Sequence, residues 1–503
     1  MPAERRTAVV DLGSNSFRLV VFTWSDAWWK RTDEIYEAVR VGEGLEETGA
    51  LQPAPMARAL ETIELFAHFC RATGITDVRP VATSAIREAT NREAFLEQAA
   101  RRTWLPIHVL SREQEARYGY LAAANSTTIT DGLTLDIGGG SMQLVRVEGR
   151  HASDMRSWEL GAVRMTERFL GTGRAKPKRV KALRAHVKDE LAAAPWIRAG
   201  GRMAGVGGAV RNLAAAAMAL QGLPSFGVQG FRLTRDALGD LVDRLADMTP
   251  EERGRLDGIK PERGDVILAG ALVVHGVMEA GGYDDLEATE AGLREGVFFG
   301  TVLEGADPPL LEDVRRESVT NLAAQFGADE QHTGHVARLA LEMWDALGAD
   351  GLYRGDAQER ELLWAAALLH DIGVTVDYDD HHKHSRYLIL NAQLPGWSPR
   401  ETALIAQICR YHRKGTPQLG ELTPLARRGD DRILARCAAI LRLAEQLERA
   451  RDQAVRHARV DVGDEDVALR LEADGDVTVA RWAAERHRDV FSHAFGRRLS
   501  IGG

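Results

Sequence analysis

Two short stretches of the sequence share one plan: Asp11-Leu12-Gly13-Ser14-Asn15-Ser16 and Asp136-Ile137-Gly138-Gly139-Gly140-Ser141. In each, an apolar run ends in an aspartate, and glycine and hydroxyl residues then lead into a second apolar run. Glycine lets backbone N–H groups approach phosphate oxygens closely, and serine or asparagine adds further hydrogen bonds. An aspartate repels phosphate, so it would instead hold a divalent cation that bridges to it. The pair predicts a phosphate-binding cleft between two domains.

The surrounding residues indicate that the two stretches belong to similar α/β units. Residues 7–12 and 17–23 read as strands on either side of the first turn, and residues 133–137 and 142–147 do so around the second. A further glycine turn, Gly205-Val206-Gly207-Gly208, joins a short strand to an alanine-rich helix. A single glycine hairpin is common in proteins, but two aspartate-marked copies followed by a third turn favour a phosphate site.

Length, composition and charge restrict the class of protein. The chain has 503 residues, of which 45% are hydrophobic, and its net charge is −9. It is long enough for about three or four packed domains, and the acidic balance argues against a nucleic-acid partner. Three widely spaced cysteines support neither a disulfide framework nor a cysteine zinc site. The apolar run from Val266 to Met278 is too short to span a membrane, and no signal-peptide core precedes Asp11. We therefore expect a cytoplasmic protein.

The pattern of elements changes along the chain. Strand-like and helix-like segments alternate up to the Glu304–Pro309 stretch, which reads as a linker. A histidine-rich helical pattern runs from Leu310 to about Ala454, and alternating apolar residues around Asp474-Gly475-Asp476 then predict a small β-containing end. The sequence predicts four domains, at residues 1–127, 128–306, 310–454 and 455–503.

Two further stretches resemble the signatures of a known family. Residues 82–89 (ATSAIREA) and 110–117 (LSREQEAR) are similar to motifs of the exopolyphosphatases and guanosine pentaphosphate phosphohydrolases, within the actin-like superfamily. The resemblance continues through residues 292–296, 384–385 and 411–414 and covers essentially the whole chain. It implies two actin-like (ribonuclease H-like) α/β domains, an all-α HD-like domain and a small C-terminal α+β unit.

The resemblance also implies roles for individual residues. Glu115 matches the catalytic glutamate that accepts a proton from water, and Arg87 is expected to bind the terminal phosphate. Asp11 and Asp136 would hold Mg²⁺ or Mn²⁺. The expected phosphate contacts are Gly13, Ser14, Asn15, Ser16, Gly138, Gly139, Gly140, Ser141, Gly207 and Gly208, together with Arg413 and Lys414 in the second half.

One position departs from the family pattern. The second turn normally continues into a glutamate that serves as an active-site carboxylate, whereas this chain has Gln143. A neutral amide can orient water, but it cannot act as a base and is a weaker ligand for a hard cation. Glu115 would then carry proton transfer largely alone, or the metal requirement has shifted.

The histidines of the second half suggest another metal site. His332 and His335 can share a helix face, and a predicted helix ends in His370-Asp371. Residues 440–445 are similar to the last helix of HD-type phosphohydrolases, in which the final ligand is aspartate rather than the Glu445 found here. We predict a second site at His335, His370, Asp371 and Glu445, in a region that is generally a structural module in this family.

Exopolyphosphatase activity, with processive release of orthophosphate from inorganic polyphosphate, is the expected function. Hydrolysis of the 5′-terminal phosphate of guanosine 5′-triphosphate 3′-diphosphate (pppGpp) is the alternative, because both substrates present a triphosphate-like end. A sugar-kinase-like phosphotransferase and a non-catalytic (p)ppGpp sensor also stay open. Basic residues 410–428 are the expected track for a long polyanion, with 164–184 as the other basic stretch. The resemblance further implies a homodimer.

Overall fold

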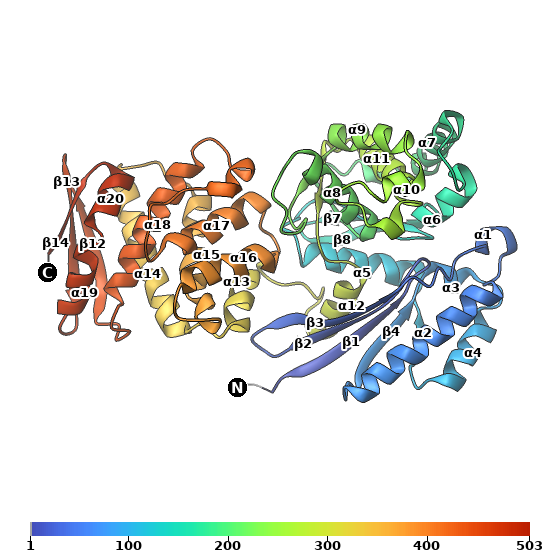
Figure 1. The fold of residues 1–503 in the computed structure, drawn as a ribbon, viewed down its shortest axis with the longest axis horizontal. Helices are drawn as coiled ribbons and strands as arrows, with labels where there is room; N and C mark the ends of the chain where they lie inside the picture. The colour runs from blue at the N-terminus through green and yellow to red at the C-terminus, as the bar shows by residue number, and fades with distance from the viewer. Residues whose placement is uncertain (1–2, 503) are drawn as a thin grey trace. The chain divides into compact units, whose positions relative to one another are not determined.

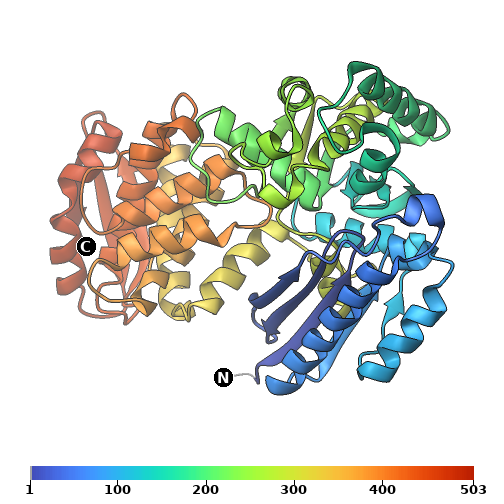
Figure 2. The ribbon, with the colours of Figure 1, turned by 45° about the vertical axis from the view of Figure 1, so that its right-hand side comes forward.

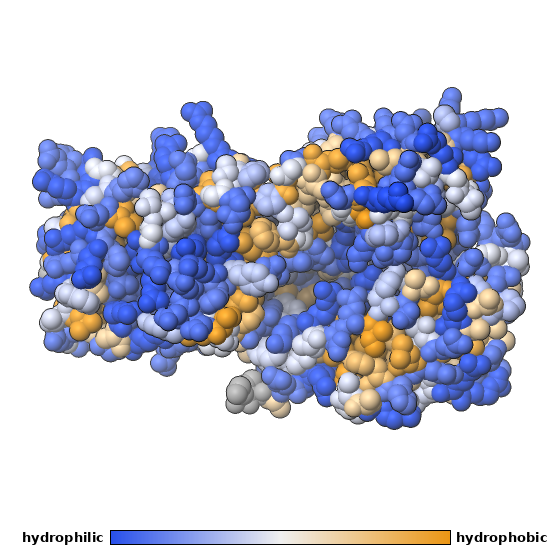
Figure 3. Space-filling model, viewed as in Figure 1, coloured by the Kyte–Doolittle hydropathy of each residue, from blue (hydrophilic) through white to orange (hydrophobic). Residues whose placement is uncertain are grey.

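A computed structural model describes residues 3–502, and the chain forms two compact units, residues 1–314 and 315–503. The first unit contains two sheets whose strands alternate with helices (Figure 1). The second unit is mainly helical and ends in a small sheet. In the view of Figure 3, hydrophilic residues cover most of the visible face and apolar residues form scattered groups. Among the described residues, no helix combines the length and apolar composition that crossing a bilayer requires.

The first sheet has the strand order β3-β2-β1-β4-β5. The first three strands along the chain form an antiparallel meander, and β4 then pairs in parallel with β1. Helix α2 runs along this sheet (Figure 2) and contributes to its core. The elements are β1 (Arg5–Leu12), β2 (Phe17–Trp24), β3 (Trp29–Glu37), α1 (Leu45–Thr48), α2 (Pro53–Ala72), β4 (Asp77–Ala82), α3 (Ser84–Glu88), α4 (Arg92–Arg102) and β5 (His108–Val109).

The second sheet repeats this plan with the order β10-β11-β9-β6-β7-β8. Again an antiparallel meander is followed by a strand, β9, that pairs in parallel with the first strand. The two strand pairs predicted around the glycine turns are therefore confirmed as β1–β2 and β6–β7. The strands are β6 (Gly132–Ile137), β7 (Met142–Glu148), β8 (His151–Trp158), β9 (Arg202–Val206), β10 (Arg232–Thr234) and β11 (Asp285–Ala288).

Strands β3 and β8 were not predicted. Both end the meander at a sheet edge, and most of their side chains are exposed. An exposed edge strand needs no apolar alternation, so its sequence carries little strand signal.

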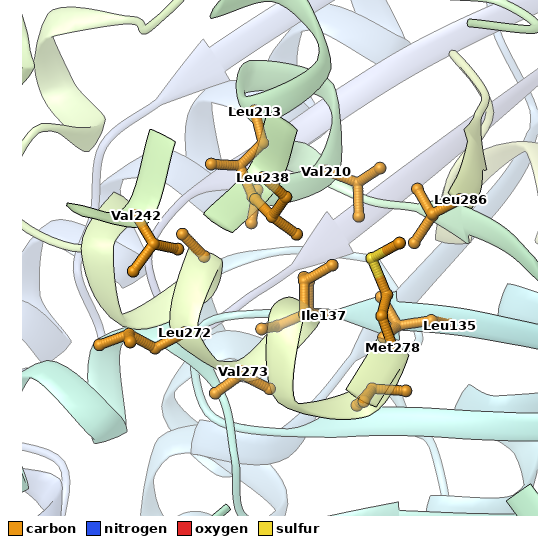
Figure 4. Close-up of a cluster of buried hydrophobic side chains, with 14 of the residues drawn as sticks. Leu135, Ile137, Val210, Leu213, Leu238, Val242, Leu272, Val273, Met278 and Leu286 are labelled. Atoms are coloured by element: carbon orange, nitrogen blue, oxygen red, sulfur yellow. The ribbon is translucent and has the colours of Figure 1, made fainter. Parts of the chain in front are cut away.

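Helix α11 explains the long apolar run of the sequence. Its residues are buried almost throughout, in a core that it shares with strands β6 and β11 and with helices α8 and α9 (Figure 4). The helices of this part are α5 (Arg112–Ala124), α6 (Ala162–Met165), α7 (Pro177–Ala192), α8 (Gly208–Leu220), α9 (Arg235–Ala246), α10 (Pro250–Arg253) and α11 (Ile267–Gly281), with a π-helical turn at Thr166–Leu170 and short 3₁₀ turns at Pro195–Ile197 and Pro261–Arg263.

Helix α12 (Leu293–Val302) corrects one predicted domain boundary. It packs against α5 and against β1 of the first sheet, and the ring of Phe298 stacks on that of Phe22 with centroids 4.3 Å apart. Residues 128–306 therefore do not form a self-contained domain, because their last helix completes the outer face of the first sheet.

The second unit joins the predicted helical and terminal regions in one body. Helix α14 packs on β12, and α18 packs on α19 and α20, so residues 455–503 lie on the helical region rather than apart from it. The elements are α13 (Val314–Gln325), α14 (Glu330–Ala349), α15 (Ala357–Leu369), α16 (His381–Ala392), α17 (Pro399–Tyr411), α18 (Asp430–Leu447), β12 (Val455–Val462), β13 (Asp466–Ala473), α19 (Thr478–Glu485), α20 (Arg488–Phe495) and β14 (Arg498–Gly502), with 3₁₀ turns at Ile372–Thr375 and Gly420–Leu425.

Candidate active site

The two aspartates of the repeated stretch occupy equivalent places in the two sheets. Asp11 is the penultimate residue of β1 and pairs with Arg18 of β2. Asp136 is the penultimate residue of β6 and pairs with Gln143 of β7. Because the sheets have the same order, both carboxylates stand at the ends of corresponding strands, where the glycine turns begin.

The two turns lie against one another. The first is closed by the Gly13 N–H, which donates to the Ser16 carbonyl oxygen at 3.2 Å, and the second has the same bond from residue 138 to residue 141 at 3.0 Å. A Cβ atom added to Gly139 would lie 3.1 Å from Ser14 Cβ, and one added to Gly140 would lie 3.1 Å from the Ser14 hydroxyl oxygen. Glycine thus lets the second turn approach the first closely.

A cleft opens at these turns, and most predicted residues line it. Those that do are Asp11, Gly13, Ser14, Asn15, Ser16, Glu115, Asp136, Gly138, Gly139, Gln143, Gly207 and Gly208. Of the predicted residues in the first unit, Arg87, Gly140 and Ser141 are not part of this lining. Arg87 and Ser141 nevertheless bind Glu115 directly.

Helix α5 positions Glu115 in its first turn. Ser111 caps this helix, and the Gln114 side chain accepts a hydrogen bond from the Ser111 N–H at 2.9 Å. Glu115 itself is buried; its Oε2 accepts from Arg87 Nη1 at 2.6 Å and its Oε1 from the Ser141 hydroxyl at 3.2 Å. Gln114 therefore caps the first turn of the helix, and Glu115 is held in one orientation at the cleft.

Gln143 is connected to Glu115 through one hydroxyl group. The Gln143 Nε2 donates to the Ser141 hydroxyl oxygen at 2.9 Å and to the Ser157 hydroxyl oxygen at 3.1 Å. Because Ser141 accepts from Gln143, its own hydrogen is free to point at Glu115. The sequence indicated only a lost carboxylate here, whereas the structure shows a buried amide that orients the partner of Glu115.

Three carboxyl groups share this cleft. Desolvation, together with the neighbouring charges of Glu115 and Asp11, raises the pKa of Asp136 to about 7. Desolvation likewise raises the pKa of Asp11 and of Glu115, although Arg87 opposes the effect at Glu115. Such a group of oxygen donors matches the preference of Mg²⁺ and Mn²⁺, so Asp11 and Asp136 fit the predicted cation.

Four arginines also line the cleft, and the sequence analysis did not single them out as site residues: Arg18, Arg211, Arg263 and Arg294. Arg294 is buried, and within residues 3–502 its Nε and Nη1 have no hydrogen-bond partner. Desolvation and the nearby charge of Arg294 lower the pKa of Arg211 to about 10. Arginines crowded together at this cost in solvation indicate a binding site for a polyanion.

Sequence signals existed for three of these arginines. Arg294 falls in the family-like stretch 292–296, Arg211 follows the Gly207-Gly208 turn by one helical turn, and Arg18 faces Asp11 across the hairpin. Arg263 ends the short 3₁₀ turn Pro261–Arg263 and reaches the cleft only through the fold, where its guanidinium group covers Gly208.

The remaining predicted residues lie in the second unit. Lys414 Nζ is 3.1 Å from Asp380 Oδ1, and Arg413 is half-exposed near Tyr378. His370, Asp371 and Glu445 come together in one cluster, but His335 does not join them. Its Nε2 lies 3.0 Å from the Val455 carbonyl oxygen. The prediction of His335 is therefore corrected, because its position on α14 turns the ring toward β12; His332, one turn earlier, faces the cluster instead.

The duplicated sheet and the cleft at its glycine turns match the actin-like phosphatase architecture that the sequence predicts. The model of the Ppx/GppA phosphatase family matches residues 31–304, and that of Ppx/GppA phosphatase, domain III, matches residues 314–483. The chain belongs to the Ppx/GppA phosphatase family.

Individual relatives agree with this assignment. Two proteins named guanosine-5′-triphosphate,3′-diphosphate pyrophosphatase are similar to the chain: one from Vibrio vulnificus, 29% identical over 88% of this chain and 87% of its own, and one from Vibrio atlanticus, 28% identical over 96% of each. The crystal structure of the Aquifex aeolicus family member is 30% identical, with a TM-score of 0.53 over 60% of this chain and 99% of its own. An exopolyphosphatase from Cytophaga hutchinsonii, 21% identical with a TM-score of 0.56, shares the fold.

The raised pKa of Asp136 predicts how stability varies with pH when divalent cations are removed. At pH values between 3.8, the ordinary pKa of an aspartate, and about 7, the folded state keeps a proton on Asp136 that the unfolded state loses. The free energy of unfolding therefore declines as pH rises toward 7. We expect the thermal midpoint of Asp136→Asn to fall less than that of the wild type between pH 5 and 8. Asp154→Asn, on the exposed edge strand, serves as the control and should follow the wild type. If the thermal midpoint varied with pH in the same way in all three proteins, the raised pKa of Asp136 would be contradicted.

Proposed function

We propose that the protein hydrolyses the terminal 5′-phosphoanhydride bond of guanosine 5′-triphosphate 3′-diphosphate and releases orthophosphate. The proposal rests on the cleft, which is lined both by the carboxylates of Asp11, Asp136 and Glu115 and by four arginines. Phosphoryl transfer needs an oriented water, a proton acceptor and neutralisation of the transferring group, and this cleft offers residues for each. The sequence analysis placed polyphosphate first, whereas the names of the two curated relatives favour the alternative it left open.

Each residue has a definable part in this reaction. A divalent cation held by Asp11 and Asp136 would neutralise charge on the phosphate oxygens. Glu115 accepts a proton from the water whose oxygen attacks the terminal phosphorus. The bond from that phosphorus to the bridging oxygen then breaks, and the bridging oxygen stays with the shortened nucleotide. Desolvation raises the pKa of Glu115 toward the operating pH, as suits a general base.

The guanidinium groups supply the remaining charge. Arg87 uses Nη1 for Glu115 and for the Leu110 carbonyl oxygen. Within the described residues its Nε and Nη2 have no hydrogen-bond partner, as is also true of two nitrogens of Arg294. Arg294 lines the cleft, so its two nitrogens fit the oxygens of a transferring phosphoryl group. Arg87 lies outside the lining and acts here through Glu115.

Glu115→Gln tests the base. The change is near-isosteric and should keep the fold, and we expect turnover to fall by roughly 10²- to 10⁴-fold, the usual contribution of a general base. Glu113→Gln, at an exposed position two residues earlier, is the matched control and should keep near-normal turnover. Near-normal phosphate release by the Glu115 variant, in preparations free of host enzyme, would remove Glu115 from this role.

Gln143→Glu tests the altered position. A fourth carboxylate beside Asp136 should bind the cation more tightly, so we expect the Mg²⁺ concentration for half-maximal activity to fall. Gln143→Met removes the amide without adding charge and should impair turnover by releasing Ser141, with no gain in metal affinity. An unchanged Mg²⁺ titration in the glutamate variant would show that this position does not reach the metal.

Polyphosphate is the second candidate substrate, favoured by exposed basic residues of the second unit at Lys414, Arg427 and Arg428. We expect kcat/KM for pppGpp to exceed that for long polyphosphate and for tripolyphosphate, measured side by side at one salt concentration with no acceptor present. A higher value for long polyphosphate, with full-length chains persisting beside free phosphate on a gel, would reverse the order. Phosphate transfer only when a sugar is added would contradict hydrolysis altogether.

A further inference from the structure

The second unit gathers six metal-binding side chains around one point. They come from five successive helices, and all are buried or nearly so. None of them takes part in the proposed hydrolysis, which uses residues of the first unit. Its members are His332 of α14, His370 and Asp371 at the end of α15, His381 of α16, His412 at the end of α17 and Glu445 of α18.

Asp371 lies at the centre of the cluster. Its Oδ1 is 3.3 Å from His381 Nε2, 3.6 Å from His370 Nε2 and 3.9 Å from His412 Nε2. Its Oδ2 is 3.7 Å from His332 Nε2. One carboxylate thus faces four imidazoles, with its two oxygens directed at different members of the set.

Glu445 closes the other side of the cluster. Its Oε2 lies 3.1 Å from His332 Nε2 and 3.2 Å from His370 Nε2. Two ligands bound to one ion at about 2.0–2.1 Å are roughly 2.9–3.4 Å apart. The atoms of this cluster therefore stand close to the spacing that a bound ion would impose, and the longer arm of glutamate reaches the position that aspartate was expected to fill.

Hydrogen bonds to the backbone set the imidazole tautomers. The Nδ1 atoms of His370, His381 and His412 lie 2.7, 2.8 and 2.7 Å from the carbonyl oxygen three residues earlier in each case. A carbonyl oxygen only accepts, so each Nδ1 carries a hydrogen, and each Nε2 is the atom that a neutral ring offers to a metal ion. His381 Nε2 and His412 Nε2 are 3.1 Å apart. Two nitrogens at this distance either share one proton or bind one metal ion.

His332 faces both carboxylates of the cluster. The side chain is 3% exposed, and its Nδ1 has no hydrogen-bond partner among residues 3–502. Its Nε2 lies 3.1 Å from Glu445 Oε2 and 3.7 Å from Asp371 Oδ2, so an ion bound between these three atoms would be enclosed by them. Three arginines lie at the edge of the cluster: Arg451 Nη2 is 2.7 Å from Asp371 Oδ2, Arg449 Nη1 is 3.9 Å from Glu445 Oε1 and Arg413 Nη1 is 3.4 Å from His381 Nδ1. None of these three contacts reaches an Nε2 atom of the cluster.

We propose that the second unit binds two divalent transition-metal ions that share Asp371. One ion takes His332, His370, Asp371 and Glu445, and the other takes Asp371, His381 and His412. Imidazole with carboxylate suits Mn²⁺, Fe²⁺, Co²⁺ and Zn²⁺ and selects against Mg²⁺. The backbone bonds to Nδ1 orient the ligands in the way that outer partners do in metal sites. The second set has only three protein donors, so it leaves a coordination position for water or an anion.

The test measures bound metal in the full-length chain. The protein is stripped with a chelator, reloaded with Mn²⁺ or Zn²⁺ in excess Mg²⁺ to occupy the first-unit cleft, desalted, and its metal counted by mass spectrometry. We expect about two ions per chain, about one in His412→Gln and almost none in Asp371→Asn. His384→Gln, one turn after His381 on α16 and outside the cluster, is the matched control and should match the wild type. Equal metal content in the wild type and Asp371→Asn would overturn the proposal.

A second measurement needs no variant of a buried residue. Co²⁺ in a site of imidazoles with an open position absorbs visible light far more strongly than Co²⁺ surrounded by six oxygens. We therefore expect the stripped wild type, loaded with Co²⁺ in excess Mg²⁺, to gain strong visible bands that Zn²⁺ abolishes by competition. A spectrum no stronger than that of hydrated Co²⁺ would overturn the proposal, whatever the folding of the variants.

Discussion

The placement of three carboxyl groups in one desolvated cleft is the constraint on which the first unit depends. Asp11 and Asp136 stand there because two sheets of the same order meet at corresponding strand ends, and Glu115 joins them from α5. Desolvation, together with repulsion between these groups, raises the pKa of Asp136. Arginines from both domains, together with the expected cation, provide the opposite charge. The same charges that make the empty cleft costly make it suited to a phosphate chain bridged by metal.

Much of this arrangement could be predicted from the sequence, because buried strands and glycine turns carry strong local signals. The turns at Gly13 and Gly138, and the strands on either side of them, follow from apolar runs that end in aspartate. Edge strands β3 and β8 could not be predicted, because exposed strands need no apolar pattern. The contact of α12 with the first sheet depends on distant segments and has no local signature.

Side-chain partners were the hardest features to predict. The choice between His332 and His335 depends on which side of one helix turn faces the neighbouring helices, and spacing alone leaves both open. Arg263 ends a short 3₁₀ turn and meets the cleft only in the folded chain. For Gln143 the sequence showed a missing charge, but its bonds to two serine hydroxyls became visible only in three dimensions. The roles of the two histidines and of Arg263 are set by neighbours far away in the sequence. That of Gln143 depends on the pairing of β7 with the unpredicted edge strand β8, which brings Ser157 opposite it.

The two proposed metal sites differ in their donor atoms. The site in the first unit has carboxylate oxygens, while that in the second combines imidazole nitrogens with carboxylates. Such sets favour different cations, so we expect that the two units can be loaded separately in one chain.

Hydrolysis of pppGpp in ¹⁸O-labelled water tests the central claim most directly. Attack by water on the terminal phosphorus, with cleavage on its side of the bridging oxygen, places one ¹⁸O atom in the released orthophosphate and none in the shortened nucleotide. Mass spectrometry of both products after a single turnover shows which product carries the ¹⁸O atom. Label in orthophosphate alone is the predicted result, and label in the nucleotide, or release of pyrophosphate instead of orthophosphate, would contradict the account.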